Sequence, residues 1–219
     1  MKSKIPVYSI VGLLILLGIP FSLSGSERAN IGEYFEKSFI YEAQGNYAAS
    51  LNSVLQILRV EPKNYIAVLR AGWLNYLNGA YGLSIEYYKK ANFIAPDAIE
   101  PKLGLLLPLM ASKKWKDSKK TAFEILKFDR KNYLANRRLA YILFSEMSYD
   151  EAEKQYKKVI NWYPSDIEMK LGLAWTNLRM DRKEKATQYF REVLKVRRHN
   201  PNALSGLEKI KMIETSTEE

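Results

Sequence analysis

Residues 71–96 read AGWLNYLNGAYGLSIEYYKKANFIAP and hold most of one unit of a 34-residue repeat. The proline that ends this stretch, Pro96, lies 34 residues after Pro62 and 68 residues before Pro164, with Arg130 at the intermediate position. A period of 34 residues is too long for one helix or strand and too short for a domain. It therefore indicates a repeated pair of secondary-structure elements.

Five segments with this period align without a gap, and their columns agree in size and polarity. The segments are 31–64, 65–98, 99–132, 133–166 and 167–200. Three of the columns are Ser50, Ser84, Ser118, Ala152 and Ala186; Ile57, Ala91, Ile125, Val159 and Val193; and Tyr47, Tyr81, Trp115, Tyr149 and Lys183. Small residues in the first column would allow two helices to approach closely.

Each segment carries the signals of two helices joined by a turn. Gly45-Asn46 and Asn78-Gly79 mark a tight turn halfway through the first two segments. Apolar residues recur at helical spacing around it, as in Leu51, Val54, Leu55 and Leu58. The closing proline ends the second helix because it cannot continue the hydrogen-bond ladder.

The pattern resembles the tetratricopeptide repeat family. The second segment matches through Ala71-Gly72, Gly79-Ala80-Tyr81, Tyr88, Ala91 and Pro96, and the fourth through Leu139-Ala140, Tyr149, Ala152, Tyr156, Val159 and Pro164. It departs at Arg130 and Arg198, which replace the closing proline. The resemblance implies an all-α, right-handed superhelical solenoid of five helix–turn–helix repeats. Residues 201–214 would form a C-terminal capping helix, followed by a polar tail, 215–219.

The composition argues against catalysis and cofactors. The chain has no cysteine, so it can form neither disulfides nor cysteine metal sites. His199 is its single histidine and precedes Pro201 in a predicted loop. No glycine-rich phosphate loop follows a predicted strand. We therefore predict a non-enzymatic protein without metal or cofactor.

Residues 1–25 lie outside the repeat and are predicted to direct export. Lys2 and Lys4 precede an apolar run of 19 residues, Ile5–Leu23, and small residues follow it. As a helix the run would extend about 28 Å, nearly the thickness of a bilayer core. Length therefore does not separate a cleaved signal peptide from a transmembrane anchor, although Pro20 favours cleavage. Both interpretations place the repeats outside the cytoplasm, periplasmic or anchored in the inner membrane. A buried core helix is a third interpretation.

The resemblance implies that the first helix of each pair lines a concave face. Of the 25 residues at the family's groove positions, 18 are apolar here. The candidate groove residues are Phe35, Phe39, Leu69, Trp73, Tyr76, Leu103, Leu107, Met110, Arg137, Tyr141, Phe144, Leu171, Trp175 and Arg179. A surface with this many apolar residues usually marks an interaction site. Alternatively, superhelical curvature or the terminal helix buries part of it.

These features predict a protein–protein interaction module or scaffold of the cell envelope. Its partner would be a protein or peptide, such as an amphipathic helix laid in the groove. Arg137 and Arg179 would each hold one acidic group of a ligand, although solvated arginines are the simpler interpretation. One alternative is a scaffold that forms homo-oligomers. Another is a basic surface, given the net charge of +10, that binds an anionic membrane or envelope polymer. We expect no nucleic-acid partner for an exported chain.

Overall fold

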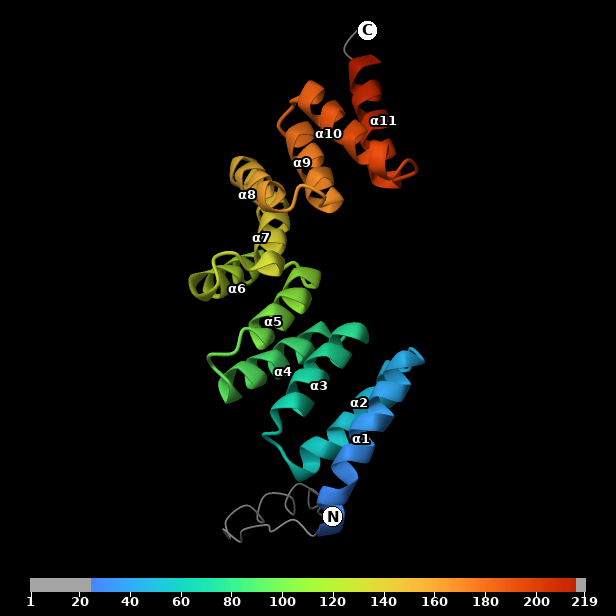
Figure 1. Ribbon diagram of the computed structural model, residues 1–219, viewed down its shortest axis with the longest axis vertical. Helices are drawn as coiled ribbons and strands as arrows, with labels where there is room; N and C mark the ends of the chain where they lie inside the picture. Colours follow the sequence, from blue (N-terminus) through green and yellow to red (C-terminus); the bar gives the residue numbers. More distant parts are fainter. Residues whose placement is uncertain (1–24, 216–219) are drawn as a thin grey trace, which may run out of the picture.

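The computed structural model describes residues 25–215, which form eleven α-helices and no strand. Consecutive helices pack as antiparallel pairs that stack into an elongated, curved array (Figure 1). The all-α solenoid predicted from the sequence is confirmed. The helices are α1 Gly25–Ala43, α2 Tyr47–Val60, α3 Tyr65–Leu77, α4 Tyr81–Ile94, α5 Glu100–Ala111, α6 Trp115–Phe128, α7 Tyr133–Ser145, α8 Tyr149–Trp162, α9 Ile167–Arg179, α10 Lys183–Val196 and α11 Pro201–Thr215.

The turn inside each pair uses the same backbone geometry. The second residue after each first helix has a positive φ, in the left-handed region, and the chain turns sharply there. These residues lie 34 apart: Gly45, Gly79, Lys113, Met147 and Asp181. Glycine adopts this conformation freely, whereas the three later turns hold a residue with a side chain there. The second helix then begins two residues later, at the column that contains Tyr47 and Tyr81.

Asparagine or aspartate caps most of the first helices. The side chains of Asn64, Asn132 and Asp166 each accept a hydrogen bond from the backbone N–H three residues later. Ala98 stands at the equivalent position before α5, and this helix begins instead at Glu100 with proline in its first turn and no side-chain cap.

The small-residue column lies inside the helix pairs. All five of its members are fully buried. The Ser50 hydroxyl donates to the Ser38 carbonyl at 2.7 Å, and the Ser84 hydroxyl donates to the Gly72 carbonyl at 2.7 Å, so both hydrogen bonds cross between the helices of a pair. Ser118 instead bonds within its own helix, to the carbonyl of Lys114.

Successive pairs meet through a ring of one pair and a glycine of the next. The rings of Tyr88, Tyr156 and Phe190 lie on Gly104, Gly172 and Gly206, where an added Cβ would stand 2.1, 2.3 and 2.2 Å from the nearest ring atom. Burial raises the pKa of Tyr88 to about 12. At the other two junctions the ring is replaced by Val54 or Ala122, and the glycine by Arg70 or Arg138.

Two sequence predictions concern the start of the chain. Apart from Gly25, the segment predicted as a signal peptide or anchor lies outside the described residues. The helix α1 begins at Gly25, six residues before the predicted start of the first repeat at 31. No helix among residues 25–215 combines the length and apolar character needed to cross a membrane.

The junction contact predicts the effect of adding one methyl group. In Gly172→Ala the new Cβ would overlap the Tyr156 ring, and we expect the free energy of unfolding to fall by about 1–3 kcal/mol. Gly82→Ala is the matched control, because a Cβ there meets no atom within 4 Å on an exposed part of α4. It should leave stability unchanged or raise it by up to about 1 kcal/mol. Urea denaturation followed by circular dichroism measures both. Equal stability of the two variants would contradict the proposed packing.

Candidate functional site

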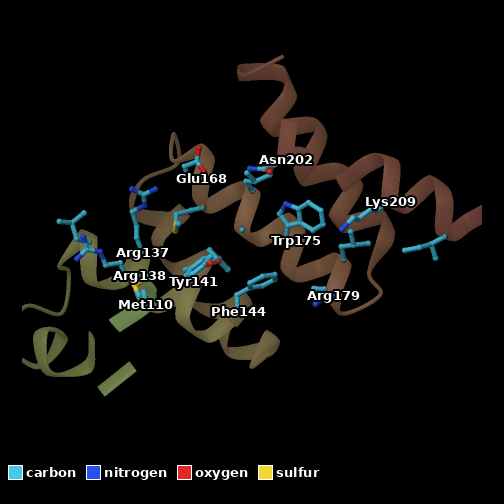
Figure 2. A pocket seen from close by; sticks show the side chains of 17 residues that line it. Met110, Arg137, Arg138, Tyr141, Phe144, Glu168, Trp175, Arg179, Asn202 and Lys209 are labelled. Atoms are coloured by element: carbon cyan, nitrogen blue, oxygen red, sulfur yellow. The ribbon is translucent and has the colours of Figure 1, made fainter. Parts of the chain in front are cut away.

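The largest hollow described here lies on the concave side of α7 and α9. Its volume is about 850 Å³, with Met110 of α5 at one edge and α11 at the other (Figure 2). It brings together half of the predicted groove residues. These are Met110, Arg137, Tyr141, Phe144, Leu171, Trp175 and Arg179.

Aromatic rings form much of its surface, and the second helices hold them from behind. Tyr141 contacts Trp115 edge-on at 6.1 Å between ring centroids, and its side chain is 48% exposed. Phe144 contacts Tyr149 in the same way at 5.7 Å. Trp175 meets Phe190 at 5.2 Å and belongs partly to the core. Tyr141 is therefore the most accessible anchor for a ligand.

The hollow has more positive than negative charge. Glu168, its one carboxylate, is paired with Arg197 at 3.2 Å, and Arg137 lies 3.3 Å from Asp166. The side chain of Arg179 is exposed and forms no ion pair or hydrogen bond with the rest of residues 25–215. Such a cation, next to an apolar surface, is available to a carboxylate of a ligand.

Two further cations of the hollow have contacts other than ion pairs. Lys209 of α11 lies 5.2 Å from the centre of the Trp175 ring. Arg138 donates from Nη1 to the carbonyl of Leu103 at 2.6 Å, and burial lowers its pKa. This carbonyl neighbours that of Gly104, which has no N–H partner because residue 108 is proline. Arg138 therefore adds a hydrogen bond to α5 beside the place where its ladder lacks a donor.

A smaller hollow of about 250 Å³ near the N-terminal end contains two more predicted residues, Leu69 and Trp73. The polar side chains around it already form hydrogen bonds with one another. Glu42 accepts from Trp73 Nε1 and from Arg70 Nη2, both at 2.7 Å, and thereby ties α1 to α3. The guanidinium of Arg70 also lies 3.7 Å from the centre of the Phe39 ring. These residues bind one another rather than presenting free groups to a ligand.

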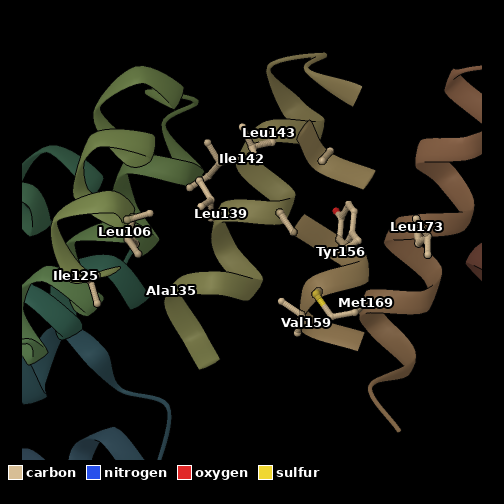
Figure 3. Close-up of a cluster of buried hydrophobic side chains, with 13 residues drawn as sticks. Leu106, Ile125, Ala135, Leu139, Ile142, Leu143, Tyr156, Val159, Met169 and Leu173 are labelled. Carbon is tan, nitrogen blue, oxygen red and sulfur yellow. The ribbon is translucent and has the colours of Figure 1, made fainter. Parts of the chain in front are cut away.

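The remaining predicted residues line neither hollow. Phe35 packs against the buried cluster of the first pairs, and Tyr76 stacks on Trp73 at 5.7 Å. Leu103 packs on the central buried cluster, which runs from Leu106 of α5 to Leu173 of α9 (Figure 3). Leu107 is half-buried on α5. The predicted positions thus belong to two separate hollows and the packing between them.

Several residues of the larger hollow did not emerge from the sequence. Asn202, Lys209 and Ile213 come from α11, which the sequence predicted only as a cap. Arg138 shares a repeat column with Gly104 and Gly172. A charged residue at a position that is glycine in other repeats is the sequence signal that could have identified it. The described residues contain no cluster of three or more acidic, histidine or cysteine side chains that would hold a metal.

Comparison with known proteins supports the repeat fold. Models of the tetratricopeptide repeat match residues 40–99, 138–166 and 167–200. The uncharacterized protein ycf37 of Cyanophora paradoxa is 31% identical over 120 residues, which cover 53% of this chain and 70% of that protein. The chain belongs to the tetratricopeptide repeat family. This fold serves protein–protein interaction and is generally non-enzymatic.

Solved structures share the tetratricopeptide fold at low sequence identity. A tetratricopeptide repeat protein of Parabacteroides merdae has a TM-score of 0.77 at 14% identity, over 85% of this chain and 74% of that one. MamA of Desulfovibrio magneticus RS-1 has a TM-score of 0.72 at 16% identity, over 78% and 97%. YrrB, described as having an unusual peptide-binding site, has a TM-score of 0.68 at 15% identity, over 84% and 98%.

The closed network at the N-terminal hollow predicts a stability effect. Glu42→Ala would remove the acceptor of both Arg70 and Trp73 in a partly buried place, and we expect a loss of about 2–3 kcal/mol in unfolding free energy. Glu33→Ala is the control, since its pair with Lys37 is solvent-exposed and should contribute little to the unfolding free energy. Chemical denaturation compares the two variants. A loss at Glu42 no larger than that at Glu33 would contradict a structural role for the network.

Proposed function

We propose that the chain is a non-enzymatic interaction module that binds an apolar or amphipathic segment of a partner protein. The binding site is the hollow between α7, α9 and α11. One observation carries this proposal: the half-exposed Tyr141 ring lines the same hollow as the Arg179 guanidinium, which has no ion pair within residues 25–215.

The dimensions of the hollow suit a short segment rather than a long extended chain. Its volume of about 850 Å³ lies in the range of roughly 300–1,000 Å³ typical of ligand pockets. Apolar side chains of the partner would cover Tyr141 and Phe144, while an acidic side chain would pair with Arg179. The peptide-binding site attributed to YrrB supports the same kind of ligand.

We propose that the chain acts in the cell envelope. Lys2, Lys4 and the apolar run Ile5–Leu23 support export through a signal peptide or retention by an anchor. The partner would then meet the hollow outside the cytoplasm.

Self-association is the second candidate function. The outward face of α11 exposes Leu204, at 46%, and Met212, at 64%, on the last helix of the array. A second copy that covers this face would extend the solenoid. Sedimentation of the full chain over a range of concentrations distinguishes this function, because a concentration-independent monomer excludes it.

A photoreactive amino acid at position 141 of the full chain tests the binding hollow. We expect it to form a discrete crosslink with a partner in the cells that produce the protein, and Arg179→Glu should reduce the yield roughly tenfold by reversing the charge. The same probe at Arg191, on the exposed face of α10, is the control.

The products separate the possible outcomes. A crosslinked species of twice the chain's mass would assign the hollow to self-association. Equal yields from positions 141 and 191, or no effect of Arg179→Glu, would reject the hollow as a binding site.

A further inference from the structure

The second helices α4 and α6 expose three phenylalanines. Phe93 is 82% exposed, Phe128 66% and Phe123 48%, although phenylalanine is normally among the most buried residues. All three lie on elements that take no part in the hollow of α7, α9 and α11. The proposed partner site therefore does not account for them.

Two of the phenylalanines belong to outward rows of their helices. Residues three or four apart share one face of a helix. The outward row of α6 is Lys116, Lys120, Phe123 and Lys127, and that of α4 is Glu86, Lys89 and Phe93; every member is exposed. The inward rows are buried, with Ser118, Ala122 and Ile125 on α6.

Contacts of Lys102 place the third ring beside the end of α4. The Lys102 ammonium donates to the carbonyl of Pro96 at 2.6 Å and lies 5.9 Å from the centre of the Phe128 ring. Phe128 is therefore next to the turn that follows Phe93. Figure 1 shows this turn and α6 on the same side of the array. We call the exposed residues of α4 and α6 the phenylalanine–lysine face.

The face carries an excess of unpaired positive charge. Five exposed lysines form no ion pair within residues 25–215, and only three carboxylates accompany them on the two helices. The lysines are Lys89, Lys90, Lys116, Lys120 and Lys127. The carboxylates are those of Glu86, Asp117 and Glu124.

We propose that the phenylalanine–lysine face docks on an anionic lipid bilayer. Aromatic rings and lysines together suit the lipid interface, where the rings enter the boundary between headgroups and acyl chains and the ammonium groups meet the phosphates. A protein partner that covered the rings would also have to bury the lysines between them. A bilayer needs no such desolvation, because a lysine stem reaches outward to keep its charge in the headgroup layer.

The last helix pair, α9 and α10, lacks the same combination. The residues of α10 that correspond to Phe93 and Phe123 are Lys195 and Arg191, which supply charge without a ring. These positions provide a matched control, since they occupy the same place in the 34-residue unit.

The absence of cysteine makes a site-specific test simple. Single-cysteine variants Phe123→Cys and Arg191→Cys of the full chain would be labelled with an environment-sensitive fluorophore. Both carry the same residues 1–24, so any insertion of that segment into vesicles occurs in both variants. The probe is a vesicle of phosphatidylcholine with phosphatidylglycerol, compared with pure phosphatidylcholine.

We expect a blue shift of the label at position 123 with the anionic vesicles only, and none at position 191. Replacing Lys116, Lys120 and Lys127 with Gln should lower the docking constant by on the order of a hundredfold. Added salt should weaken docking as well. Phe128→Ser should weaken docking at constant charge.

Three results with vesicles would overturn the proposal. They are no shift at position 123, equal shifts at positions 123 and 191, and a shift that is independent of lipid charge. A shift caused by membrane-free cell extract, without a response to vesicles, would also overturn it and assign the face to a protein partner. None of these results bears on the partner site at Tyr141.

Discussion

The close approach of an aromatic ring to a bare backbone holds successive helix pairs together. In a solenoid each pair contacts only its neighbours, so stability along the chain depends on every junction. Tyr88, Tyr156 and Phe190 reach the next pair only because Gly104, Gly172 and Gly206 present no side chain. At the other two junctions the equivalent positions hold Val54 and Arg70, or Ala122 and Arg138, and both arginines bond to a first helix.

The two junctions that contain Arg70 and Arg138 instead of glycine also shape the concave surface. Arg70 turns toward α1 and joins Glu42, whose other oxygen holds Trp73, and this network occupies the N-terminal end. Arg138 turns toward α5 and leaves Tyr141 uncovered beside it. In the larger hollow, Arg137 is paired with Asp166 at the margin, and Arg179 forms no ion pair within residues 25–215.

The sequence predicted much of the fold because a strict period records which positions recur. The column of Tyr47 and Tyr81 marks the first residue of each second helix, and half of the candidate groove residues line the larger hollow. The period does not record which side chains meet across pairs. The bond from Trp73 to Glu42 joins residues of different columns, and Lys209 reaches Trp175 from a helix outside the repeat. Such contacts depend on side-chain length and direction, which a repeat pattern does not contain.

The missing cap of α5 has a consequence for how the molecule opens. This helix has Ala98 where its counterparts have asparagine or aspartate, contains Pro108, and is followed by Ala122 where three of the junctions use a ring. Local free energies of opening differ along a repeat array, and cooperativity is lost first where the coupling is weakest. The array should therefore divide at α5 and α6 into two blocks that unfold separately. Amide hydrogen exchange would be fastest there, ahead of both flanking blocks.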